Sequence, residues 1–186
     1  PFLLFNESNL DTMKRMPDNF IDLTVTSPPY DDLRTYKGYC FDFENVAQEL
    51  FRITKHGGVL VWIVGDATID GSETGTSFKQ ALYFKSIGFK LHDTMIWNKQ
   101  MFSAVGSLKL RYAPVFEYMF IFSKGTPKTF NPIKDRINKS FGRKITGTNV
   151  TANRSSRKVS CYGNDINEFG QRFNVWEMSS EMNRTI

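Results

Sequence analysis

The residues of this chain best suited to chemistry form one short segment, Ser27-Pro28-Pro29-Tyr30, which Thr26 joins to the apolar run at 21–25. Proline has no backbone N–H, and it pushes the preceding residue toward extended conformations. The corner therefore keeps its carbonyl oxygens free to accept hydrogen bonds. Ser27 adds a hydroxyl oxygen, and Tyr30 adds an aromatic face and a phenol. Such a set could hold a flat ring that carries an amino group; the alternative is a rigid exit from a strand, without a chemical role.

The charge of the chain is concentrated in one segment. Residues 124–158 contain ten lysines and arginines and one aspartate, so this segment carries a charge of +9. The whole chain carries +5, so the other residues together carry −4. A basic segment on a mildly acidic body is typical of binding to a phosphate backbone, although a solvated tail has the same composition. The candidate DNA-binding residues are Lys134, Arg136, Lys139, Arg143, Lys144, Arg154, Arg157 and Lys158.

Hydrophobic periodicity predicts the elements that position these residues. Helices are expected near 9–16, 41–54 and 76–87, and strands at 2–5, 21–26, 59–64, 89–97, 115–122 and 174–178. Alternation of strands and helices predicts an α/β fold with a mostly parallel sheet. The strands at 89–97 and 115–122 have no helix between them, so we expect an antiparallel pair at one edge of the sheet.

The segment Thr26-Ser27-Pro28-Pro29-Tyr30 at the end of a strand resembles motif IV of the β-group DNA amino-methyltransferases. The resemblance implies a Rossmann-like sheet with S-adenosylmethionine as the cofactor and DNA as the substrate. It divides the chain into a partial catalytic core at 1–125, a basic segment like a target-recognition region at 126–173, and a short terminal element at 174–186. Asn6 and Ser8 stand where the family contacts the cofactor, together with Ser27, although the family usually has an acid in place of Ser8.

The family's glycine-rich cofactor loop has no counterpart in this sequence. We therefore expect an incomplete sheet of about five strands, in a fragment or truncated form of such an enzyme, and activity of this chain alone is uncertain. In this fold the missing segment supplies two central strands beside the strand at 21–26. An exposed apolar sheet edge promotes association, so a homodimer or a complementing chain is a further expectation.

The resemblance implies methyl transfer to a base that is flipped out of the duplex. Ser27 Oγ and the Pro28 carbonyl would accept hydrogen bonds from the amine, Pro29 would stiffen the corner, and Tyr30 would stack on the base. Serine in the first position favours cytosine N4 over adenine N6. Two alternatives remain, namely an inactive remnant that binds DNA and an RNA amino-methyltransferase.

The remaining features restrict the class of protein. The sequence shows no spacing of metal ligands, so no metal is expected. It has neither a secretory leader nor a long apolar run, which predicts a cytoplasmic protein without a membrane-spanning segment.

Overall fold

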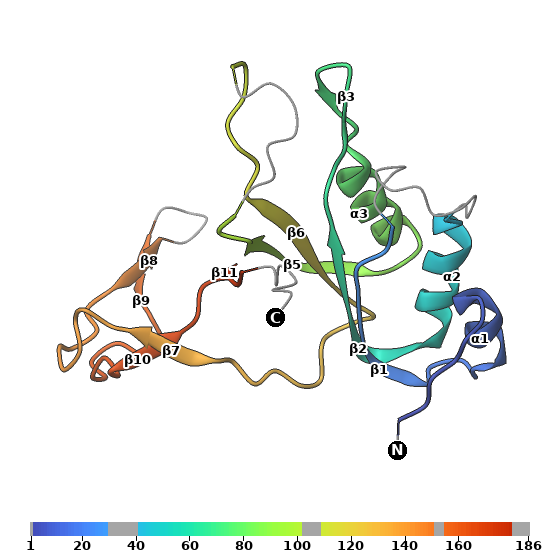
Figure 1. Ribbon diagram of the computed structural model, residues 1–186. Coiled ribbons are helices and arrows are strands. Elements are labelled where there is room, and N and C mark those ends of the chain that lie inside the picture. The colour runs from blue at the N-terminus through green and yellow to red at the C-terminus, as the bar shows by residue number, and fades with distance from the viewer. Residues whose placement is uncertain (1, 30–40, 102–108, 151–154, 180–186) are drawn as a thin grey trace. The chain divides into compact units, whose positions relative to one another are not determined.

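The computed structural model describes residues 2–29, 41–101, 109–150 and 155–179 of the chain (Figure 1). The helices are α1 (Asn9–Arg15), α2 (Phe43–Ile53) and α3 (Thr76–Ser86). The strands of the main sheet are β1 (Ile21–Thr26), β2 (Thr54–Val64), β5 (Lys90–Asn98), β6 (Phe116–Ser123) and β11 (Val175–Glu177). All three predicted helices form, and five of the six predicted strands form.

These five strands make one mixed sheet in the order β1-β2-β6-β5-β11. β1 runs parallel to β2, β11 runs parallel to β5, and β6 is antiparallel to both of its neighbours. The α/β class and the five strands agree with the prediction, and β5 and β6 are the expected antiparallel pair. The pair does not form the edge, because β11 adds outside β5 through a pairing that joins residues far apart in the sequence.

The predicted strand at 2–5 does not form. Its side chains are exposed, with Leu3 and Leu4 at 80% and 97% of their full accessibility. Within the described part of the chain, β1 pairs only with β2, so the first apolar stretch has no strand beside it to complete a ladder. An apolar pattern alone therefore did not produce a strand here.

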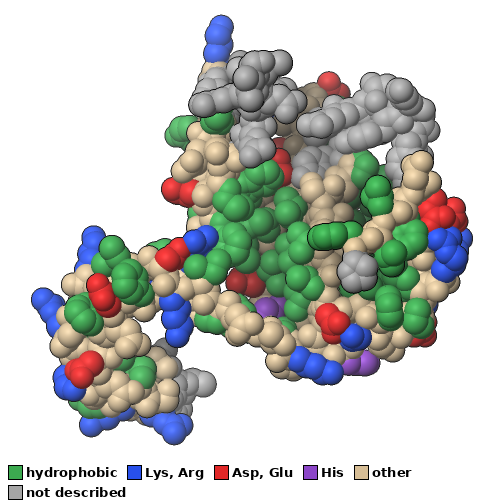
Figure 2. Space-filling view, turned by 60° about the horizontal axis from the view of Figure 1, so that its bottom comes forward, with side chains coloured by type: hydrophobic (Ala, Val, Ile, Leu, Met, Phe, Trp, Pro, Cys, Tyr) green, Lys and Arg blue, Asp and Glu red, His purple; other side chains and the backbone are tan. Residues whose placement is uncertain are grey.

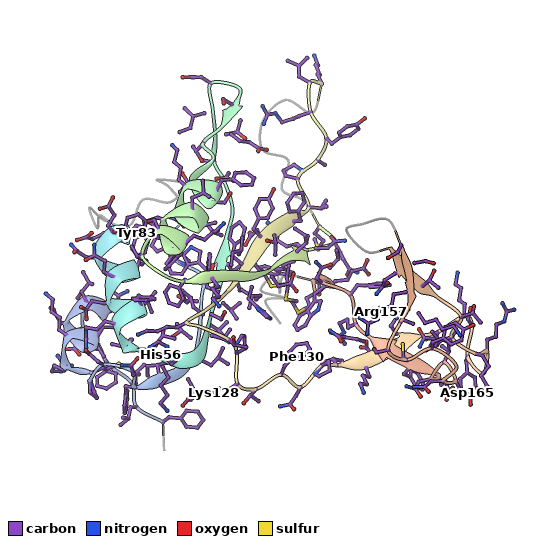
Figure 3. All side chains as sticks on the ribbon, turned by 180° about the vertical axis from the view of Figure 1, so that it is seen from behind. His56, Tyr83, Lys128, Phe130, Arg157 and Asp165 are labelled. Carbon is purple, nitrogen blue, oxygen red and sulfur yellow. The ribbon has the colours of Figure 1, made fainter. Side chains whose placement is uncertain are left out.

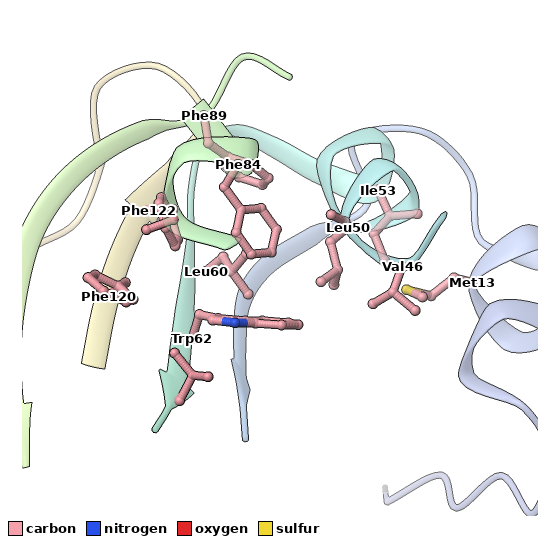
Figure 4. Packing of buried hydrophobic residues seen from close by; sticks show 13 residues of the cluster. Met13, Val46, Leu50, Ile53, Leu60, Trp62, Phe84, Phe89, Phe120 and Phe122 are labelled. Atoms are coloured by element: carbon pink, nitrogen blue, oxygen red, sulfur yellow. The ribbon is translucent and has the colours of Figure 1, made fainter. Parts of the chain in front are cut away.

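The hydrophobic core lies between one face of the sheet and the three helices (Figure 4). Trp62 and Phe84 are its largest fully buried side chains, and their rings meet edge to face with centroids 4.9 Å apart. The indole N–H of Trp62 donates to Gln80 Oε1 at 2.8 Å, which satisfies the one polar atom of that side chain. Helix α2 begins at Asp42, whose carboxylate accepts a hydrogen bond from the backbone N–H of Asn45.

Among the described residues, no strand pairs with the outer edge of β1, and the opposite face of the sheet near it is apolar and exposed. Leu23 and Val25 pair with Val59 and Val61 of β2, so these four side chains share the face that points away from the helix-covered core. Leu23 is 58% exposed and Val25 is 60% exposed. Figure 2 shows hydrophobic side chains gathered on the displayed face of the larger unit. A strand with these properties at a sheet edge is a template for pairing with another segment.

The chain divides into two compact units, and each is described by itself. Unit 1 comprises Pro1–Phe130 with Asn174–Ile186, and unit 2 comprises Asn131–Phe173. Unit 2 contains two small antiparallel ladders: β7 (Lys134–Ile137) with β10 (Phe169–Gln171), and β8 (Thr148–Val150) with β9 (Ser156–Lys158). A further hairpin in unit 1 pairs β3 (Thr68–Ile69) with β4 (Ser72–Glu73). None of the helices in the described ranges has the length and apolar character needed to span a membrane.

Candidate active site

The segment at 27–29 follows the carboxyl end of β1. β1 and β2 are parallel, and Thr26 pairs with Trp62, so the segment leaves the sheet beside the last residues of β2. Pro28 is buried, Pro29 is half-buried and Ser27 is exposed. The buried ring of Pro28 anchors the corner, while the Ser27 side chain stays accessible to a ligand. Tyr30, the fourth predicted catalytic residue, lies outside the described residues.

Asp66 lies just beyond the end of β2 and holds the start of α3. Its carboxylate accepts hydrogen bonds from the backbone N–H of Ser77 at 2.8 Å and from Ser77 Oγ at 2.5 Å. It also accepts one from Thr74 Oγ1 at 3.4 Å. Asp66 therefore satisfies a backbone donor in the first turn of α3, where helices have unpaired N–H groups. Its position next to the candidate site makes it a support for that edge of the sheet.

A row of aromatic side chains ends at the same edge of the sheet and was not singled out in the sequence analysis. Phe116, Tyr118 and Phe120 alternate along β6, and Tyr118 pairs with Val64 at the end of β2. The rings of Tyr118 and Phe120 stack with centroids 5.3 Å apart. Burial raises the pKa of the Tyr118 phenol, and the carboxylates of Asp66 and Glu73 act in the same direction. The phenol is thus held in its neutral form, which can donate a hydrogen bond.

The predicted cofactor residues Asn6 and Ser8 are exposed and precede α1. The Ser8 carbonyl accepts from the backbone N–H groups of Asp11 and Thr12, at 3.1 Å and 3.2 Å, so this residue begins the helix. The neighbouring acid, Glu7, pairs with Arg15, and this hydrogen-bonded ion pair lowers the pKa of the Glu7 carboxyl. Because the stretch at 2–5 does not join the sheet, Asn6 and Ser8 do not sit on a strand beside Ser27.

Most of the predicted DNA-binding residues lie on the surface of unit 2, where Lys and Arg side chains are spread over its outline (Figure 2). Lys134 and Arg136 lie on β7, and Arg157 and Lys158 lie on β9. Lys139 and Arg143 occupy turns, and Lys144 forms an isolated β-bridge with Asp165. Lys144 pairs with Asp165 at 2.7 Å. Arg154 lies outside the described residues.

Lys124 is an exception among the basic residues of the segment 124–158. It is only 8% exposed, and its Nζ donates to the Phe51 carbonyl at 2.7 Å and to Asn19 Oδ1 at 3.0 Å. It therefore stabilises the carboxyl end of α2. The charge count of the sequence included it with the surface cations because burial cannot be recognised from composition.

The ordinary metal-ligating side chains do not cluster in the described residues: no group of three or more His, Cys, Asp or Glu could hold an ion there. The candidate site thus consists of hydrogen-bond acceptors, a neutral phenol and aromatic rings at the carboxyl edge of an α/β sheet. Ligands bind at this edge in open α/β sheets. The fold is that of a Rossmann-like α/β domain.

Comparison with known proteins gives the family. The family model N6_N4_Mtase, described as DNA methylase, matches residues 21–184. The chain belongs to this family of DNA methyltransferases of the N6/N4 type. The membership confirms the resemblance and agrees with S-adenosylmethionine as the expected cofactor.

Individual relatives agree with this assignment. The orphan methyltransferase M.BamHII of Bacillus amyloliquefaciens is 55% identical over 170 residues, covering 87% of this chain and 60% of that protein. The type II beta methyltransferase M.BslI of Bacillus sp. (strain NEB-606) is 27% identical over 153 residues, covering 69% of this chain and 17% of that protein. The chain therefore spans three fifths or less of these two relatives.

A solved structure shares the fold. The PvuII DNA methyltransferase (cytosine-N4-specific) superposes with a TM-score of 0.60 at 18% sequence identity. The match covers 96% of this chain and 58% of that chain. The likeness shows that the mixed sheet described above is a methyltransferase fold.

Proposed function

We propose that this chain is the base-binding part of a site-specific DNA amino-methyltransferase. The target would be an exocyclic amine, with cytosine N4 favoured over adenine N6 because serine rather than aspartate stands at position 27. The observation that carries the proposal is the accessible Ser27 side chain on a corner anchored by the buried Pro28, at the carboxyl end of β1.

The proposed chemistry follows from the groups at that corner. The lone pair of an exocyclic amine is delocalised into its ring, so the amine is a poor nucleophile. Ser27 Oγ and the Pro28 carbonyl would accept hydrogen bonds from its two N–H groups and draw the nitrogen toward tetrahedral geometry. Tyr30 would stack on the extruded base, with Pro29 keeping the corner stiff. The two acceptors would hold the amine in one orientation, and positioning supplies much of the rate in such reactions.

The methyl donor of the proposed reaction is S-adenosylmethionine, which supplies an electrophilic methyl group on a sulfonium. Asn6, Ser8 and Ser27 were expected to contact it. The exposed positions of Asn6 and Ser8, away from any strand beside β1, do not by themselves fit a site for this cofactor. Further residues would complete that site.

The free edge of β1 supports a second segment or chain as the completing partner. Leu23 and Val25 present an uncovered apolar row, and the other side of β1 has no strand among the described residues. Added strands would cover both features. A second copy of this chain or a separate polypeptide could supply these strands. Both relatives are longer than the part that this chain matches.

Transfer of labelled methyl groups tests the proposal. The chain joined to the remaining part of M.BamHII is incubated with labelled S-adenosylmethionine and either duplex DNA or structured RNA. Label recovered as N4-methylcytosine in DNA supports the proposal, and N6-methyladenine would correct the target base. DNA binding without transfer would identify the inactive remnant, and transfer to RNA alone would identify the RNA enzyme.

A further inference from the structure

The β8–β9 ladder of unit 2 places two side chains with base-reading chemistry next to each other. In its antiparallel register Asn149 lies directly opposite Arg157. Side chains of directly opposed residues point to the same face, with Cβ atoms about 4.5–5.5 Å apart. A carboxamide and a guanidinium are therefore neighbours on one face of a two-stranded ribbon, whose place in unit 2 is marked by Arg157 in Figure 3.

These two side chains have no structural task among the described residues. Both are exposed, and neither takes part in a hydrogen bond or an ion pair there. Two other arginines of unit 2 are engaged: the Arg136 guanidinium lies 4.6 Å from the centre of the Phe173 ring, and Arg172 pairs with Asp135. Arg157 is thus available for an external acceptor in a way that Arg136 and Arg172 are not.

The ribbon side chains that the structure describes form no core of their own. The side chains of Thr148, Ser156 and Lys158 are exposed as well. A two-stranded ribbon without a buried face is at best marginally stable, so packing does not account for its composition. An open hollow of about 450 Å³ lies along it, lined by Asn149, Arg157, Lys158, Val159 and Ser160.

The dimensions and the chemistry of the ribbon fit the major groove of DNA. The groove is about 12 Å wide and admits a two-stranded ribbon, whose strands are about 4.8 Å apart. Arginine binds the O6 and N7 of guanine in two hydrogen bonds, and asparagine binds the N6 and N7 of adenine in the same way. Lys158 belongs to the other face, and its Nζ lies 4.2 Å from the centre of the Tyr162 ring.

We propose that the β8–β9 ribbon enters the major groove of the target duplex, where Arg157 reads a guanine and Asn149 reads a nearby adenine. The inference rests on the proposed function only in taking duplex DNA as the substrate. It assigns sequence selection to two of the polar residues of unit 2, and leaves to lysines such as Lys158 the contacts that do not depend on sequence.

Selection from a random duplex pool tests this assignment by binding alone. The full chain is used to enrich sequences, and the selected positions are compared between wild type, R157K and N149A. R157K keeps the charge and loses the forked donor pair, so preference at one guanine should fall by about 5- to 150-fold, the worth of one bidentate contact. Binding to unselected DNA should change little. N149A should lose preference at one adenine instead.

R172K is the matched control, because Arg172 lies in unit 2 outside the ribbon, is not one of the candidate DNA-binding residues, and pairs with Asp135. This variant should select the wild-type sequence. Circular dichroism of each variant checks that unit 2 keeps its fold.

The assignment is overturned if R157K retains the full wild-type preference or if wild type enriches no sequence. It is also overturned if duplex RNA competes as well as DNA, because side chains cannot read the deep, narrow major groove of A-form RNA. The selection needs no methyl transfer, so an inactive chain that still selects a sequence would refute the proposed activity and leave the ribbon's role intact.

Discussion

Substitution of Lys124 by methionine should destabilise the protein without weakening DNA binding. The Lys124 ammonium lies 4.5 Å from the centre of the Phe51 ring and donates to the Phe51 carbonyl at 2.7 Å, at the end of α2. The last carbonyls of a helix have no partner within it. Removing a charged donor from such acceptors costs about 1–3 kcal/mol. For a domain of this size, a loss of about 2 kcal/mol lowers the Tm by roughly 4–8 °C.

Thermal unfolding followed by circular dichroism measures this loss. K79M is the matched control, since Lys79 is exposed on α3 and its side chain has no hydrogen bond or ion pair among the described residues. K79M should unfold within about 0.5 kcal/mol of wild type. Below the Tm, K124M should bind duplex DNA as wild type does, because the ammonium points into unit 1. Equal stability of K124M and K79M would refute the role given to Lys124.

The pH dependence of the same variant gives a second test. Burial lowers the pKa of Lys124 from its ordinary 10.5, with Asp18 acting weakly in the opposite direction. Between the folded and unfolded pKa values the unfolded chain binds more protons, so the contribution of Lys124 to stability rises with pH in that window. The stability of wild type relative to K124M should therefore grow as the pH approaches 10.5. A difference that shrinks over this range would contradict the buried position.

Two further substitutions test the cap of α3 and the outer edge of β1. D66A should lower the unfolding free energy by about 1–2 kcal/mol, because Ser77 at the start of α3 loses two acceptors. D66N keeps one acceptor oxygen, so its loss of unfolding free energy in a denaturant titration should be smaller. Equal losses for the two variants would argue against Asp66 as the cap of α3. L23K should leave the stability of the isolated chain within about 0.5 kcal/mol, because Leu23 is already exposed. L23K should reduce association with the second copy or separate polypeptide proposed to pair with β1, measured by sedimentation, because lysine blocks pairing at an open strand edge. Undiminished association would show that this edge of β1 is not where the partner pairs.

Local sequence patterns predicted most elements of the fold. The apolar run at 59–64 became the second half of β2, and the spacing of Val46, Ala47 and Leu50 gave the buried face of α2. These predictions succeeded because burial on a sheet or on one side of a helix leaves a periodic trace in the sequence. The position of β11 outside β5 was not predictable, because strand pairing across the chain depends on long-range packing.

The candidate site was predicted in part, for the same physical reasons. The corner at 27–29 is visible in the sequence because two prolines fix a backbone locally. The burial of Lys124 and the raised pKa of Tyr118 depend on neighbours contributed by distant segments. Alternating aromatics at 116, 118, 120 and 122 were a signal for the row along β6. The failure of 2–5 to form a strand shows that an apolar stretch also needs a partner.

The turnover of S27A measures the central claim most directly, namely that the corner after β1 holds the amine of the target base. The chain joined to the remaining part of M.BamHII is assayed for methyl transfer at saturating DNA, and its DNA affinity is measured in parallel. Losing one hydrogen bond that orients the amine should lower kcat by about 10- to 100-fold with DNA affinity unchanged. An unchanged kcat, or a loss of kcat accompanied by an equal loss of DNA affinity, would contradict the claim.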